Sequence, residues 1–189
     1  HVGHSQTREY AIKVIGIKVG SITAEKHVIG ENIAYSLKSD VNVNFLVYKL
    51  VVDYSVKSLI STMGLLNSEV KVISNRGNYT TLTKKSGEDY KVQSIQKGKT
   101  ILKEVAKPIN NTFASLFFNE ASANENVYAE FYADFIQITK KSKGKYIGEL
   151  DNNIDEYHYE KGELIKIIKK NPITDLVIEY QAPINKITH

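Results

Sequence analysis

The chain has 189 residues and a formal net charge of +4, and hydrophobic residues make up 42% of it. This balance excludes a disordered chain, and the length suits one domain of ordinary size. The absence of cysteine excludes disulfides, zinc–thiolate sites and cysteine nucleophiles. We therefore expect a single domain over residues 1–189, with residues 1–6 flexible because polar terminal segments are seldom held in place.

Apolar and polar residues alternate most clearly between residues 33 and 47. The apolar positions there share one parity, with Ser, Lys, Asp and Asn between them, which is typical of a strand buried on one face. These positions are Ile33, Tyr35, Leu37, Val41, Val43, Phe45 and Val47. After Phe45 the apolar parity changes, which requires a bulge, a bend or the start of a new strand.

Shorter alternating runs continue to the end of the chain, separated by glycine-containing turns such as Lys97-Gly98 and Lys161-Gly162. The runs cover residues 79–84, 90–95, 100–105, 127–139, 145–150, 163–168 and 175–180. Strands that recur at roughly 8–12-residue spacing predict an antiparallel meander of about nine to twelve strands. Such an all-β sheet cannot stay flat, so we expect it to twist and curl into a half-barrel or open barrel.

Helical periodicity is short and sparse. Near residues 112–118, Phe113, Leu116 and Phe117 fall at positions i, i+3 and i+4, which predicts one short helix with an apolar face. A weaker helical pattern at residues 56–66 is interrupted by a glycine.

The predicted helix has a place in the predicted sheet. A curled sheet that does not close leaves its concave apolar face exposed, and that face must be covered. We therefore expect residues 112–118 to pack into the open side of the half-barrel, and any space left there to form a cavity suited to an apolar ligand such as an acyl chain. The residues predicted to line that space are Tyr35, Leu37, Val43, Phe45, Phe113, Leu116 and Phe117.

Motifs of known chemistry are absent from the sequence. It contains no phosphate-binding glycine loop, no G-x-S-x-G and no H-E-x-x-H. We predict no catalytic residues, no metal site and no cofactor. Carboxylates on strands leave an alternative open, since Glu130 and Asp134 would share one strand face. That alternative is a β-barrel hydrolase or isomerase that uses strand carboxylates.

The cations indicate a solvated sheet surface. Only Arg8 and Arg76 are arginine, the residue that makes bidentate contacts with phosphate and guanine. Lysines scattered singly along alternating segments are typical of the outer face of a sheet. We therefore predict no nucleic-acid partner. No apolar run approaches the roughly 18 residues of a spanning helix, so no transmembrane segment is predicted either.

Four segments in this order resemble exported bacterial β-meander proteins of unknown function, envelope proteins of Bacteroidetes-like bacteria. They are Tyr10-x-Ile12-x-Val14-x-Gly16-x-x-x-Gly20-x-Ile22, Phe117-Phe118-Asn119-Glu120, Val127-Tyr128-Ala129-Glu130 and Tyr157-x-Tyr159-x-Lys161-Gly162-x-Leu164. The resemblance implies a non-catalytic domain in the periplasm or cell envelope. Its partner would be an apolar small molecule or an envelope protein, held on the concave face of the sheet.

Overall fold

The structure of the protein is a computed structural model that describes residues 4–45, 48–170, 172 and 174–183. These residues form one antiparallel sheet of fourteen strands and a single turn of 3-10 helix, η1 (Ala114–Phe117). The strands are β1 (Ser5–Val14), β2 (Ile17–Ile29), β3 (Asn32–Phe45), β4 (Tyr48–Ser61), β5 (Gly64–Ser74), β6 (Tyr79–Ser86), β7 (Asp89–Gln96), β8 (Lys99–Val105), β9 (Asn126–Ala129), β10 (Asp134–Ser142), β11 (Lys145–Leu150), β12 (Asn153–Glu160), β13 (Glu163–Lys169) and β14 (Leu176–Gln181). The predicted all-β meander is confirmed, with more strands than expected.

The additional strands arise where a continuous apolar pattern is cut by a tight turn. The run at residues 127–139 divides into β9 and β10, because the chain turns between them and Ala133 adopts a left-handed φ of 52°. The change of parity after Phe45 likewise marks the end of one strand, since β4 begins three residues later.

The weak helical pattern at residues 56–66 was misleading. These residues lie in β4 and β5, which pair with each other around a turn. Gly64 stands at the start of β5 with a φ of 96°, a conformation that other residues rarely adopt. Extended pairing with neighbouring strands outweighs the local helical spacing here, because it buries Val56 and Leu65 on the concave side.

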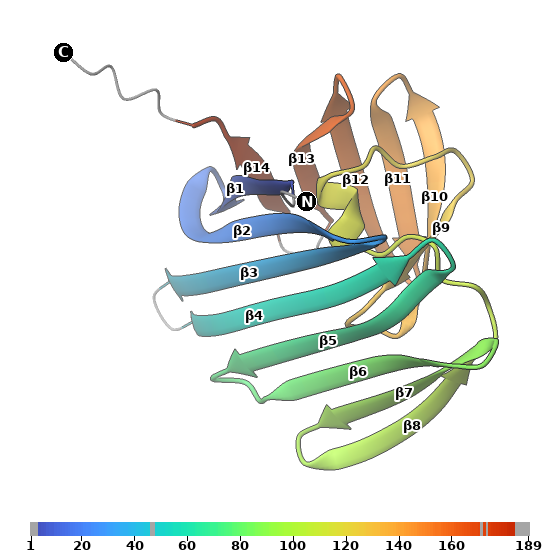
Figure 1. The fold of residues 1–189 in the computed structure, drawn as a ribbon. Helices are drawn as coiled ribbons and strands as arrows, with labels where there is room; N and C mark the ends of the chain where they lie inside the picture. The colour runs from blue at the N-terminus through green and yellow to red at the C-terminus, as the bar shows by residue number, and fades with distance from the viewer. Residues whose placement is uncertain (1–3, 46–47, 171, 173, 184–189) are drawn as a thin grey trace.

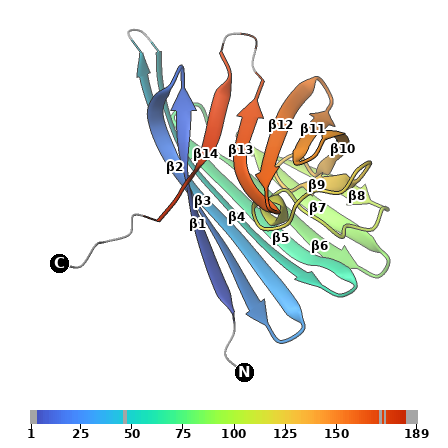
Figure 2. The same ribbon diagram turned by 90° about the horizontal axis from the view of Figure 1, so that it is seen from above.

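The sheet has two arms that meet where the two ends of the described chain pair. Its strand order is β8-β7-β6-β5-β4-β3-β2-β1-β14-β13-β12-β11-β10-β9. β1 pairs with β14 at the centre, with Tyr10 opposite Tyr180 and Ile12 opposite Ile178. From this seam the first arm runs to β8 and the second to β9, and the strong twist turns their inner faces toward each other (Figures 1 and 2).

The far ends of the arms approach through side chains. In the described part of the chain β8 and β9 are not hydrogen-bonded to each other, so the sheet stays open. The Lys103 ammonium on β8 donates to the carbonyl of Ala133 at 2.8 Å and lies 3.5 Å from the Asp134 carboxylate. The Lys107 ammonium lies 5.6 Å from the centre of the Phe135 ring. These contacts bridge the opening.

The segment between β8 and β9 crosses the concave side, and η1 lies between the two arms (Figure 1). The predicted short helix is a single 3-10 turn, and it packs inward as expected. Phe117 is 0% exposed and Leu116 is 2% exposed, both within the main hydrophobic core, while Phe113 packs against that core. The segment therefore acts as an internal cover for the open sheet.

Backbone hydrogen bonds attach this segment to both arms. The Leu65 amide of β5 donates to the Ile109 carbonyl at 2.7 Å. The Phe113 amide donates to the Tyr128 carbonyl of β9 at 2.8 Å, and the Tyr128 amide donates to the Asn111 carbonyl at 2.9 Å. Buried backbone groups need such partners, so these bonds fix the path of the segment across the sheet.

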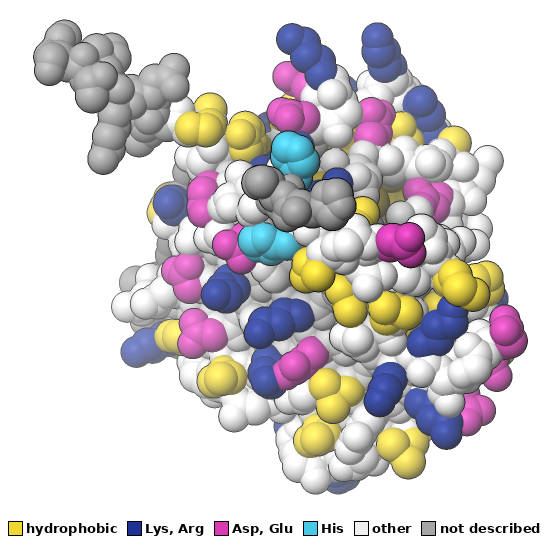
Figure 3. Space-filling view, viewed as in Figure 1, with side chains coloured by type: hydrophobic (Ala, Val, Ile, Leu, Met, Phe, Trp, Pro, Cys, Tyr) yellow, Lys and Arg dark blue, Asp and Glu magenta, His cyan; other side chains and the backbone are white. Residues whose placement is uncertain are grey.

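Charged side chains are dispersed over the face of the molecule seen in Figure 3. Lysines and arginines lie there singly, between acidic and apolar side chains. Cationic, acidic and apolar side chains are therefore mixed over this face.

Candidate functional site

A cavity of about 420 Å³ lies on the concave side, beside η1 and between the two arms. Strands near the seam supply an apolar wall, because their inward parity is occupied by aliphatic residues. This wall consists of Ile12, Ile22, Leu37, Leu176 and Ile178. The cavity is thus the part of the concave face that η1 leaves unfilled.

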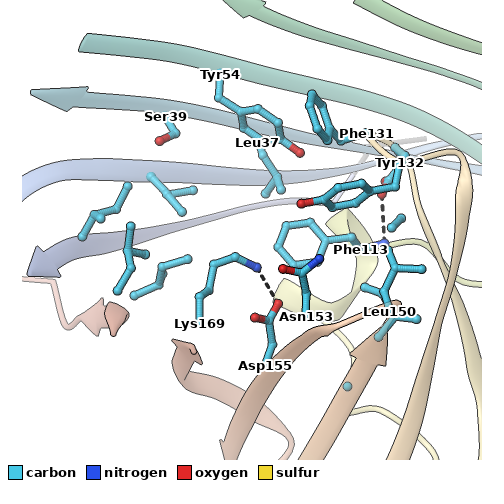
Figure 4. Close-up of a pocket in the computed structure, with 18 of the residues that line it drawn as sticks. Leu37, Ser39, Tyr54, Phe113, Phe131, Tyr132, Leu150, Asn153, Asp155 and Lys169 are labelled. Carbon is cyan, nitrogen blue, oxygen red and sulfur yellow. Dashed lines mark hydrogen bonds and ion pairs between the residues drawn. The ribbon is translucent and has the colours of Figure 1, made fainter. Parts of the chain in front are cut away.

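The opposite side of the cavity carries aromatic and polar side chains. Figure 4 shows Tyr54 of β4, Tyr132 of the β9–β10 turn and Asn153 of β12 around the same space. Across the ranges that the structure describes, neither tyrosine hydroxyl nor the Asn153 side-chain amide has an intramolecular hydrogen-bond partner. These three groups are free to bond a molecule in the cavity.

An ion pair borders the same space. Asp155 of β12 and Lys169 of β13 are opposite each other in the register of the two strands, and the Lys169 ammonium contacts the Asp155 carboxylate. The ammonium also lies 5.7 Å from the centre of the Phe113 ring. The pair brings two charges to the cavity wall, and each neutralises the other.

Glu130 also lines the cavity, but its carboxylate is engaged by the protein. It is 1% exposed and accepts hydrogen bonds from the Ser58 hydroxyl at 3.0 Å, the Phe113 amide at 3.0 Å and the Ala114 amide at 3.3 Å. Burial raises its pKa above the usual carboxyl value, although these hydrogen bonds act in the other direction. Glu130 therefore ties the β9–β10 turn to β4 and to the start of η1.

The cavity tyrosines are neutral hydrogen-bonding groups. Burial raises the pKa of Tyr54 above the usual tyrosine value, and the nearby Glu130 carboxylate adds to the effect. Burial likewise raises the pKa of Tyr132, with a further contribution from the Asp155 and Asp151 carboxylates. Both causes oppose ionisation, so each hydroxyl can donate and accept a hydrogen bond at neutral pH.

Gly148 of β11 borders the cavity, and the side chains of Ile136 and Tyr157 approach its backbone closely. A Cβ atom at this position would lie 2.7 Å from Ile136 and 2.7 Å from the Tyr157 ring. The absence of a side chain lets the tyrosine pack flush against β11.

A model of the family described as domain of unknown function (DUF6134) matches residues 10–181. The chain belongs to this family. The match spans the meander from β1 to β14 and so includes every strand that contributes to the cavity. No curated protein and no solved structure matches the chain.

In this DUF6134 domain the residues predicted to line a ligand space are divided between packed core and cavity. Leu37 and Phe113 line the cavity. Leu116 and Phe117 lie in the packed core. Tyr35 belongs to the same core, and its hydroxyl accepts a hydrogen bond from the Asn119 side chain at 3.0 Å.

The two remaining predicted residues do not reach the cavity in the described structure. Val43 is buried near the end of β3 and does not line it. The side chain of Phe45 lies outside the described residues.

Sequence reasoning did not identify the polar groups of the cavity. Neither Asp155 nor Tyr54 lies in a motif of known chemistry, and Tyr54 carries no signal beyond its strand pattern. The register of β12 and β13, had it been known, would have placed Asp155 opposite Lys169. No local signal shows that Tyr54 and Tyr132 face one cavity, because only the curl of the sheet brings them together.

The proposed pairing of Glu130 with Asp134 on one strand face was wrong. Glu130 lies in the turn before β10 and is buried, whereas Asp134 begins β10, is exposed and contacts Lys103. The turn at residues 130–133 breaks the alternation that would have kept both carboxylates on one face.

Two kinds of feature are absent from the described ranges. No group of three or more histidine, aspartate or glutamate side chains there could hold a metal ion. No helix there is long and apolar enough to cross a lipid bilayer.

Proposed function

We propose that this DUF6134 domain is a non-catalytic binding module that holds a small, mainly apolar molecule in its concave cavity. The observation that carries the proposal is the combination of an aliphatic wall with hydroxyl and amide groups that lack partners. Ligand sites typically have this composition, and volumes of roughly 300–1,000 Å³ are usual for them.

The cavity volume indicates the size of the ligand portion that the cavity can hold. Taking about 30 Å³ per water-sized group, a volume of about 420 Å³ accommodates a molecule of roughly 14 non-hydrogen atoms. A medium-length alkyl chain with a small polar end has this size and this division of character.

The state of the carboxylates favours binding over the alternative of carboxylate catalysis. A general acid or base must reach its substrate with a free oxygen or proton. Both Glu130 oxygens accept hydrogen bonds from the protein, and Asp155 is paired with Lys169. Glu130 is thereby held by the protein, and the charge of Asp155 is compensated by Lys169.

The location in the bacterial envelope, which the sequence resemblance implies, belongs to the same proposal. An envelope partner protein could deliver or receive the ligand. Fractionation of cells that express the full-length protein tests the location, and a signal confined to the cytoplasm would contradict it.

Native mass spectrometry of the purified protein and thermal unfolding with added ligand test the binding proposal. We expect 1-decanol to raise the melting temperature of the wild type. Ser39→Phe, which places a ring in the cavity, should abolish the effect. Ser36→Phe is the matched control, since Ser36 lies on the same strand with the opposite parity.

The outcomes of this experiment are distinct. A stabilisation lost in Ser39→Phe and kept in Ser36→Phe supports binding in the cavity. Equal effects of 1-decanol on all three proteins, or no effect on the wild type by 1-decanol or decanoate, would contradict the proposal.

A further inference from the structure

We propose that the cavity selects an uncharged ligand with a hydroxyl or carbonyl group, and discriminates against the corresponding carboxylate. The inference rests on the proposed function and concerns the chemical class of the ligand. It follows from the charges and the free hydrogen-bonding groups that face the cavity.

The cations at the cavity wall are already compensated. The Lys169 ammonium is paired with Asp155. The Lys170 ammonium lies 3.2 Å from the Glu156 carboxylate and 3.0 Å from that of Asp175. An entering carboxylate would have to share an ammonium whose charge a protein carboxylate already compensates.

The acidic groups add to the barrier for an anion. Glu130 lines the cavity, and among the described residues no cation forms an ion pair with it. The Asp155 and Asp151 carboxylates are close enough to Tyr132 to oppose its ionisation. A carboxylate in this space would lose its hydration without gaining a free cation, which is costly in a mostly apolar site.

The groups without partners match a neutral polar end. A tyrosine hydroxyl both donates and accepts, and the Asn153 amide supplies donors and an acceptor. Tyr54 and Tyr132 come from opposite arms of the sheet, so a ligand hydroxyl or carbonyl near them would be bonded from both sides (Figure 4). The aliphatic wall would hold the alkyl part.

The inference predicts an order of affinities that isothermal titration calorimetry can measure. At pH 8, where decanoate is ionised, 1-decanol should bind at least about tenfold more tightly than decanoate, a difference of about 1.4 kcal/mol. Decanamide, which is neutral and carries a carbonyl, should bind less tightly than 1-decanol and more tightly than decanoate.

Variants identify the groups responsible. Tyr54→Phe and Tyr132→Phe should each weaken 1-decanol binding by about three- to tenfold, the usual effect of one hydrogen bond. Binding of decanoate should change less. Tyr180→Phe is the matched control, because Tyr180 packs on Tyr10 and does not line the cavity.

The results separate this inference from the proposed function. Decanoate binding as tight as 1-decanol, or tighter, would overturn the inference and leave the binding module intact. A preference for 1-decanol that both tyrosine variants preserve would also overturn it, because the free hydroxyls would then not select the ligand. No binding by any of the three compounds would overturn the proposed function itself.

Discussion

The two regions of the concave face are lined by similar strands and differ in what fills them. In the region of η1, Phe117 and Leu116 fill the space between the arms. Beside it, a cavity of about 420 Å³ remains between the same arms. One region holds a segment of the chain itself, and the other has room for a separate molecule.

Two tyrosines of each region show the same difference. At the filled region the Tyr159 hydroxyl donates to the Leu116 carbonyl at 3.0 Å, and the Tyr10 hydroxyl donates to the Leu164 carbonyl at 3.2 Å. At the hollow region the Tyr54 and Tyr132 hydroxyls have no partner among the described side chains and backbone. The half-buried Tyr54 and the 55% exposed Tyr132 both border the cavity, so their hydroxyls are open to a molecule that enters it.

Arginine contributes to the filled region as well. The Arg8 guanidinium donates to the Phe117 carbonyl at 2.7 Å and contacts the Glu163 carboxylate at 3.2 Å. The Arg8 Cζ atom lies 5.2 Å from the centre of the Phe118 ring. The planar guanidinium makes these three contacts at once.

The largest expected effect is the loss of the internal cover. Phe117→Ala should lower the free energy of unfolding by about 3–5 kcal/mol, the usual cost of removing a buried aromatic ring. Phe131→Ala, at the half-buried rim of the cavity, should cost clearly less. Urea denaturation measures both, and equal losses would show that the two regions are packed alike.

A second effect comes from the carboxylate that joins the regions. Glu130→Ala leaves the Ser58 hydroxyl and the Ala114 amide without their acceptor, whereas the Phe113 amide keeps its bond to the Tyr128 carbonyl. Each buried unsatisfied group is costly, so we expect a loss of roughly 3 kcal/mol. An unfolding free energy within error of the wild type would mean that water replaces the carboxylate.

A smaller effect concerns pH. Burial raises the folded-state pKa of Glu130 above its usual value of 4.5, so the stability linked to this group is fully present below the unfolded pKa. It is lost as pH rises through the folded pKa, where the buried carboxyl must ionise. Glu130→Gln should remove this decline from denaturation curves measured between pH 4 and pH 8. A decline that persists in the variant would assign it to other groups.

The smallest effect tests the tyrosine contrast directly. Tyr159→Phe removes a bonded hydroxyl and should cost about 1 kcal/mol. Tyr54→Phe removes an unbonded one and should leave the ligand-free protein as stable as the wild type. Thermal unfolding of the two variants decides the matter, and equal shifts would contradict the proposed difference between the regions.

The sequence by itself determined the class of the fold and the inward packing of η1. Alternation along residues 33–45 requires a strand with one buried face, whatever lies beyond it. The spacing of Phe113, Leu116 and Phe117 gives one apolar side, and an open sheet needs such a side to cover it. These conclusions rest on local periodicity and on the need to bury apolar surface, both of which are written in short stretches of chain.

Only the tertiary structure decided the cavity and its polar groups. The pairing of β1 with β14 sets the curl of the sheet, and it joins residues more than 160 positions apart, such as Tyr10 and Tyr180. That curl places Tyr54 and Tyr132 around one space, and a turn that breaks alternation buries Glu130. Local patterns report which face of a strand is buried. They do not report which strands face one another across the open sheet, because that depends on the accumulated twist of the whole sheet.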